Sequence, residues 1–131
     1  MPSPDLPPPS DPRVFFAAER TLLAWLRTGI TVMALGFVIA RFGLFLRLVA
    51  LQAQALSPNP HGGLSGVLGI FFVVAGAVVS LAATIQHRRF IATLPPQDVP
   101  AAYSSAFAVA FGVFMAALGC ALAAYLVVSE P

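Results

Sequence analysis

The stretch RTGITVMALGFVIAR, residues 27–41, decides the fold of this chain. Thirteen uncharged residues separate Arg27 from Arg41, and as an α-helix they cover only about 20 Å. The hydrocarbon core of a bilayer is about 30 Å thick. If the segment spans a membrane, at least one guanidinium group must therefore snorkel, enter the hydrocarbon zone or face something other than lipid. An arginine inside a membrane costs at least about 2.5 kcal/mol, so function is the first interpretation to test here.

This segment belongs to a chain whose composition is that of a membrane protein. Hydrophobic residues make up 59% of the 131 residues and charged residues only 9%, whereas a soluble domain carries about 25% charged residues. Two more long uncharged runs follow the first. We therefore predict an all-α integral membrane protein with three transmembrane helices, at about residues 22–45, 64–85 and 105–128.

The N-terminal residues differ in composition from the rest of the chain. Residues 1–12 contain six prolines, which predicts a disordered, Pro-rich tail. This tail is not a signal peptide, which would begin with a basic region before a short apolar core. The three-helix membrane domain then covers residues 13–131. We expect Asp11 to cap its first helix and Pro12 to be the first helical residue.

The distribution of the arginines predicts how the chain is oriented in the membrane. Four arginines lie on one side of the predicted spans, at positions 13, 20, 88 and 89, and two lie on the other, at positions 41 and 47. By the positive-inside rule the N-terminus is expected in the cytoplasm and the C-terminus outside. The arginines flank apolar spans and form no solvated patch, so no nucleic-acid partner is expected.

Small residues recur along the second and third predicted spans. The third span carries a stripe at four-residue spacing, at Ala108, Gly112, Ala116, Cys120 and Ala124. We assign helix packing to five glycines of the two spans, Gly66, Gly69, Gly76, Gly112 and Gly119, because small residues let helices approach closely in lipid. Two uses remain open: contacts within one three-helix protomer, or an interface with a second copy or with a partner membrane protein.

A polar stripe runs along the first span. Arg20 and Arg27 lie two turns apart on nearly the same helix face, Thr31 continues that face, and Arg41 is offset from it by roughly 60°. Three explanations compete. The first is that the arginines snorkel to phosphates of the membrane lipids. The second is that they pair within the protein, for example with Glu19 of a neighbouring helix or subunit, or with backbone carbonyls. The third is that they line an oligomeric pathway for an anion, as rings of arginine do in anion pores.

The same region carries a family resemblance. The stretch AERTLLAWLRTG, residues 18–29, resembles the signature of the YidH-like family of small bacterial membrane proteins, and Gly36 and the segment IARFG, residues 39–43, continue the likeness. That family has three spans and unknown function, so the resemblance implies a multi-pass protein of the bacterial inner (plasma) membrane. The positions to which we give a motif or structural role are Glu19, Thr21, Trp25, Thr28, Thr31 and Arg41.

The domain type also resembles the membrane portion of the eukaryotic vacuolar transporter chaperone complex, a polyphosphate polymerase that passes its product across the membrane. This resemblance implies phosphate contacts for Arg20 and Arg27, with Arg88 or Arg89 at the cytoplasmic mouth of a pathway. The present sequence contains no soluble polymerase domain, so it is expected to supply a conduit or an assembly module and not the synthesis.

Three functional classes follow from these observations. The first is an oligomeric module that contacts anions or phosphate groups through arginines of the first span. The alternative is a structural or regulatory subunit of another membrane complex that transports nothing itself. An enzyme is not expected, because the sequence offers no nucleophile beside a base and no carboxylate pair. Neither a cofactor nor a metal is expected, and His61 and His87, at the two ends of the second span, are read as interfacial residues.

Overall fold

A computed structural model of the chain describes residues 11–53, 62–100 and 104–129. Within these ranges every regular element is helical: α1 (Arg13–Gln52), α2 (Gly62–Thr93), the short 3-10 helix η1 (Pro96–Asp98) and α3 (Ser105–Ser129). The three α-helices are each long and apolar enough to cross a membrane. The prediction of an all-α fold with three spans is confirmed, while residues 1–10 of the predicted tail lie outside the described residues.

Helix α1 continues for 40 residues without a break. At its start the Asp11 carboxylate accepts a hydrogen bond from the Arg13 N–H, at 3.1 Å, and the Pro12 carbonyl accepts one from the Phe16 N–H, at 3.2 Å. The helix begins at Arg13 with Pro12 at the N-cap position, so the predicted cap Asp11 and the predicted first helical residue Pro12 each lie one position before the observed ones. Asp11 still satisfies one of the N–H groups that a helix start leaves without an internal partner. The predicted first span is the middle of this helix, which extends beyond it at both ends.

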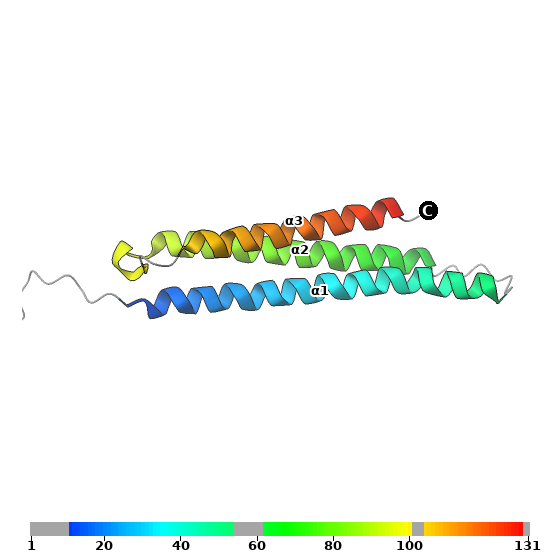
Figure 1. The fold of residues 1–131 in the computed structure, drawn as a ribbon, viewed down its shortest axis with the longest axis horizontal. Coiled ribbons are helices and arrows are strands. Elements are labelled where there is room, and N and C mark those ends of the chain that lie inside the picture. Colours follow the sequence, from blue (N-terminus) through cyan, green and yellow to red (C-terminus); the bar gives the residue numbers. More distant parts are fainter. Residues whose placement is uncertain (1–10, 54–61, 101–103, 130–131) are drawn as a thin grey trace, which may run out of the picture.

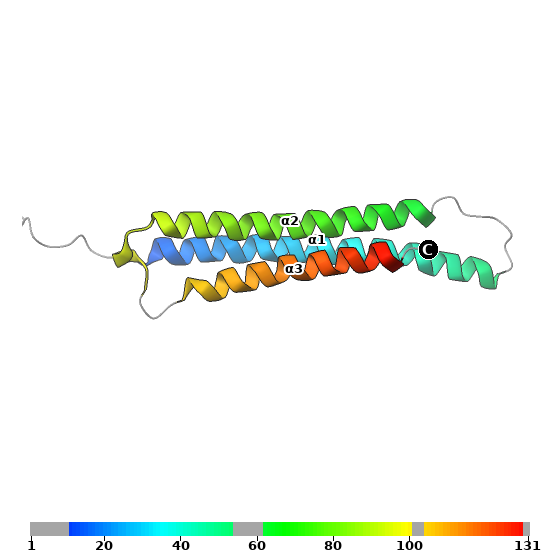
Figure 2. The ribbon, with the colours of Figure 1, turned by 90° about the horizontal axis from the view of Figure 1, so that it is seen from above.

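The three helices run up, down and up, and they form a bundle (Figures 1 and 2). Helix α2 packs against both neighbours, whereas α1 and α3 touch each other only sparingly. The start of α1, the end of α2, η1 and the start of α3 all lie at one end of the bundle (Figure 1). There the Asp98 carboxylate accepts a hydrogen bond from the Asp11 N–H at 3.0 Å, which ties η1 to the start of α1.

The contact between α1 and α2 is a seam of glycines. A Cβ atom added to Gly36 would lie 2.5 Å from the Gly69 carbonyl oxygen, and one added to Gly69 would lie 2.5 Å from the Gly36 carbonyl oxygen. Two turns away, a Cβ on Gly76 would lie 2.5 Å from the Gly29 carbonyl oxygen. The two backbones therefore touch directly, which only glycine permits at such short separations.

Buried residues of α1 recur at alternating spacings of four and three, from Phe15 through Leu22 to Gly36. This average period of 3.5 residues is the one that keeps a single stripe facing its partner along two supercoiled helices. The glycine seam lies on this stripe. The tight contacts of α1 are therefore made inside the protomer, and its opposite face is left on the outside.

Helix α3 uses its small residues differently from the sequence expectation. Gly112 lies against the side chain of Thr84, and Gly119 against Met33 and Ala77. Ala108, Gly112 and Ala116 of the predicted stripe are buried, whereas Cys120 and Ala124 are exposed on the protomer. The last two therefore do not pack inside the protomer, and their use in an interface with another copy or a partner stays a prediction. Each four-residue step turns about 40° past a full turn, so a strict four-residue stripe leaves the contact face after a few steps.

Candidate functional site

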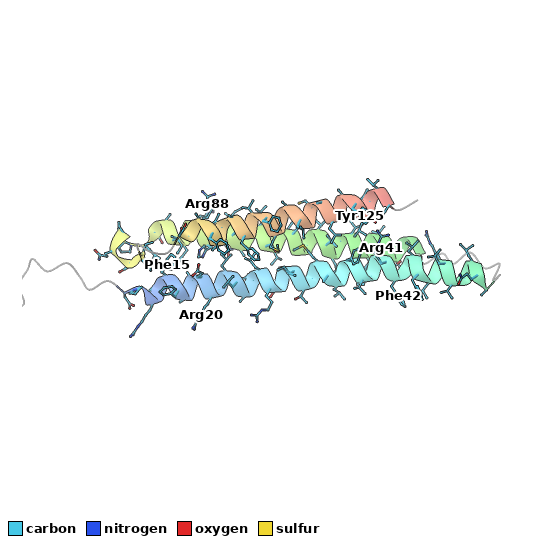
Figure 3. All side chains as sticks on the ribbon, in the orientation of Figure 1. Phe15, Arg20, Arg41, Phe42, Arg88 and Tyr125 are labelled. Carbon is cyan, nitrogen blue, oxygen red and sulfur yellow. The ribbon has the colours of Figure 1, made fainter. Side chains whose placement is uncertain are left out.

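The polar stripe of α1 lies on the outer surface of the bundle. Arg20, Arg27 and Thr31 are all exposed, and Figure 3 shows Arg20 on the side of α1 that is turned away from α2 and α3. Within the described part of the chain neither arginine forms an ion pair. A single protomer therefore presents both guanidinium groups to its surroundings and not to its own interior.

The hydroxyl groups on α1 are satisfied within the helix. Thr21 donates to the Ala17 carbonyl at 3.0 Å, Thr28 to Ala24 at 3.1 Å and Thr31 to Arg27 at 2.9 Å. Such bonds to the carbonyl four residues back let a hydroxyl lie on an apolar surface without losing a partner. The two arginines are consequently the strongest polar feature that remains on this face of α1.

Arg41 is placed differently from the other two arginines of the span. It is half-buried, and its guanidinium carbon lies 5.0 Å from the centre of the Tyr125 ring and 5.8 Å from the centre of the Phe37 ring. Both distances are those of cation–π contacts, which compensate part of the lost hydration. Of the two arginines that bracket the first apolar stretch, Arg41 thus faces aromatic rings of its own protomer, and Arg27 does not.

Glu19 points into the bundle. Its side chain is only 8% exposed and belongs to the buried stripe of α1, between Phe15 and Leu22. A carboxylate on the internal seam is not presented to a neighbouring subunit. The explanation that pairs the outward arginines with Glu19 of another copy is therefore disfavoured by this burial.

Arg88 and Arg89 are exposed on α2 at the same end of the bundle as Arg20. Arg88 projects on the side remote from α1, while Arg20 projects below α1 (Figure 3). The four arginines proposed as phosphate contacts therefore do not converge on one point within a protomer. Arg20 and Arg27 form one group, and Arg88 and Arg89 form another.

A cavity of about 540 Å³ opens between α1 and α2 at this end. Trp25, 51% exposed, lines it together with Thr21 from α1 and with Gln86 and His87 from α2. The remaining lining is aliphatic or aromatic. Two of the motif residues, Thr21 and Trp25, thus border a partly apolar hollow and not the arginine stripe.

His87 is a buried residue that the sequence interpretation placed at the interface. Its side chain is 5% exposed, and both ring nitrogens lack a hydrogen-bond partner among the described residues. The sequence did contain a signal for this position. Small residues of the second span also recur at steps of four and three, at Gly76, Ser80 and Ala83, and one further step of four residues reaches His87.

A comparison with known protein families assigns the chain. The family model described as "Domain of unknown function (DUF202)" matches residues 13–93. The chain belongs to the DUF202 family. This confirms the YidH-like family indicated by the signature around Glu19. The chain matches no curated protein and no solved structure.

The DUF202 match covers the whole of α1 and α2. It includes the outward arginine stripe, the glycine seam and His87. Together with the three apolar helices it makes the chain a multi-pass membrane protein. Among the described residues of this DUF202 protein, no group of three His, Cys, Asp or Glu side chains is close enough to hold a metal ion.

Proposed function

We propose that this DUF202 protein is a non-catalytic, oligomeric membrane module whose Arg20–Arg27 face contacts anions or phosphate groups. The observation that carries the proposal is the outward exposure of Arg27 without an ion-pair partner in the described residues. A guanidinium group in this position interacts favourably with an anion, because it supplies several hydrogen-bond donors in a fixed planar array.

The depth of Arg27 in a membrane supports this proposal. If the stretch between Arg27 and Arg41 is centred in the bilayer, each Cα atom lies about 10 Å from the midplane and about 5 Å inside the hydrocarbon core. Arg41 meets Tyr125 and Phe37 at that depth. Arg27 has no such contact among the described residues of the protomer, so its stabilisation is left to lipid phosphates, to another subunit or to a bound anion.

The use of the small residues supports assembly through the arginine face. Four glycines of α1 and α2 pack in the seam within the protomer, so they do not form an interface between copies: Gly29, Gly36, Gly69 and Gly76. If several copies surround a common axis with the outer face of α1 turned inward, Arg20 and Arg27 form two stacked rings about 10 Å apart. Rings of arginine select anions. The arginine distribution further supports a cytoplasmic N-terminus in the bacterial inner membrane.

The test is anion flux into liposomes that contain the purified protein, with chloride, phosphate and short polyphosphate as probes. The Arg27→Gln variant is expected to lower flux at least about tenfold, because removal of a charge-assisted contact costs on the order of 1.5–3 kcal/mol. Arg27→Lys keeps the charge and is expected to retain part of the flux. Arg47→Gln is the matched control, since it removes an exposed arginine from the far end of the same helix.

Native mass spectrometry of the same preparations establishes whether the variants assemble as the wild type does. Flux in the wild type and in Arg47→Gln, but not in an equally assembled Arg27→Gln, supports an arginine-lined pathway. Equal flux in all variants refutes the role of Arg27. An absence of flux from all of them, with intact assembly, removes the conduit and leaves the alternative, a structural or regulatory subunit of another membrane complex anchored to lipid by its arginines.

A further inference from the structure

A second cavity lies at the same end of the bundle, between α2 and α3. Its volume is about 470 Å³, and its polar lining side chains are His87 and Arg88 from α2 and Ser105 from α3. The rest of the lining is alanine, valine and isoleucine. Within the lining there is no carboxylate, so the cavity combines three side chains that can donate hydrogen bonds with an apolar wall.

Of the three polar side chains that line this cavity, only that of His87 is buried. Other buried polar side chains of α2 are satisfied by their own helix: Ser80 donates to the Gly76 carbonyl at 2.9 Å and Thr84 to the Ser80 carbonyl at 2.8 Å. His87 is equally buried, yet neither ring nitrogen has a partner in the described part of the chain. A buried polar group in this state is costly. A group that enters the cavity and accepts a hydrogen bond from the imidazole removes that cost.

The charges around the cavity indicate which kind of ligand group it favours. Arg88 contributes a permanent positive charge and a planar set of donors. Ser105 is the first residue of α3, a helix of 25 residues, and the N–H groups of a first helical turn point outward at the positive end of the helix dipole. Both features favour an anion with several acceptor oxygens, as phosphate has.

We propose that the α2–α3 cavity binds a phosphate group held by Arg88, Ser105 and His87. The apolar part of the lining and its place at the end of the bundle fit the head-group phosphate of a lipid, and free phosphate presents the same oxygens. This site is separate from the Arg20–Arg27 face, because Arg88 and Arg20 project on different sides of the bundle (Figure 3). Glu19, the buried carboxylate of α1, does not line the cavity.

The experiment measures lipid binding to the purified full chain by native mass spectrometry. The probes are phosphatidylglycerol and a diacylglycerol with the same acyl chains but no phosphate. Inorganic phosphate is tested separately, by its effect on the thermal unfolding temperature. His87→Leu and Arg88→Gln are each expected to weaken phosphatidylglycerol binding roughly tenfold, the effect of losing one charge-assisted hydrogen bond. His87→Gln is a second variant, in case leucine disturbs the fold.

Two controls separate this site from other positive charges. Arg13→Gln removes an exposed arginine at the same end of the bundle and is expected to bind phosphatidylglycerol like the wild type. Arg27→Gln, which tests the proposed function, is likewise expected to leave this binding unchanged, so the two proposals fail independently.

If the wild type binds phosphatidylglycerol more tightly than diacylglycerol and the His87 and Arg88 variants lose this preference, the bound group is a lipid phosphate. Stabilisation by inorganic phosphate alone, lost in the same variants, supports free phosphate as the source. Equal binding of both lipids without any effect of phosphate overturns the proposal, and so does an equal loss of binding in Arg13→Gln.

Discussion

Replacing Gly36 by alanine is expected to destabilise the bundle, although alanine is the better helix former. The added Cβ would lie 2.5 Å from the Gly69 carbonyl oxygen and 2.8 Å from the Val73 nitrogen. Both are backbone atoms, which cannot rotate away as a side chain does. Since favourable contact between such atoms begins near 3.5 Å, α2 must move back by about 1 Å.

The size of the effect follows from that displacement. A gap of about 1 Å forfeits up to half of the dispersion energy of the contacts that it opens, and overpacked interiors lose about 1–3 kcal/mol. The gain in helix propensity from glycine to alanine offsets at most about 1 kcal/mol. We therefore expect a net loss of about 1–2 kcal/mol for Gly36→Ala. Gly69→Ala creates the same clash from the other side, so the double variant should cost less than the sum of the two.

Trp25 provides the assay, because it is the one tryptophan of the chain and it lines the cavity between α1 and α2. Its fluorescence is followed while the protein, held in mild detergent, is unfolded with increasing SDS. Gly63→Ala is the control, since a Cβ at Gly63 meets nothing within 4 Å, and it is expected to be as stable as the wild type or slightly more so. If Gly36→Ala unfolds at the same SDS fraction as Gly63→Ala, the direct backbone contact of the seam is refuted.

Three further predictions rest on single contacts. Tyr125→Leu removes one ring from Arg41 and should lower the free energy of unfolding by about 0.5–2 kcal/mol, whereas Tyr125→Phe keeps the ring and most of the stability; equal losses in the two variants would point to the hydroxyl instead. His87→Leu, measured in detergent without added lipid or phosphate, should raise stability by about 1–3 kcal/mol, because it removes two unpartnered nitrogens; a lower unfolding temperature would show that His87 already has a partner. Asp98→Ala breaks the bond to the Asp11 N–H and should speed hydrogen exchange at that amide by about tenfold, with unchanged exchange as the contrary result.

The fold of this protein was predictable because its strongest signals are local. Long uncharged runs in a chain with 9% charged residues leave helices as the only spanning structure for a chain of this size. The continuity of α1 beyond its apolar stretch was less evident. The predicted span begins only at about residue 22, yet no proline or glycine interrupts the helix between Arg13 and the apolar run.

The candidate site was only partly predictable. Helical spacing places Arg20, Arg27 and Thr31 on one face, but it does not indicate whether that face turns inward or outward. In a membrane the outer surface is as apolar as the interior, and exposed residues of α1 such as Leu35 and Phe42 resemble buried ones. The direction of the stripe depends instead on the opposite face, where the glycine seam packs on α2.

The distant contacts of this site had no local signal. The cation–π contact joins Arg41 to Tyr125 across α1 and α3, and spacing along one helix says nothing about a ring on another. The four-residue stripe of α3 follows the contact face only as far as Ala116, because the contact between supercoiled helices repeats every 3.5 residues and next brings the predicted packing residue Gly119 against its neighbour. The burial of His87 likewise involves α1 and α3 together, since this residue lines a cavity with each of them.

Because α1 is one unbroken helix, a tilt of its axis displaces both of its ends. Its 40 residues extend about 60 Å, twice the thickness of the hydrocarbon core. A tilt of 10° about its middle therefore moves its two ends apart by about 10 Å in the membrane plane, in opposite directions. Since tilt responds to bilayer thickness, a thicker or thinner membrane shifts Arg20 at one end and Arg47 at the other at the same time.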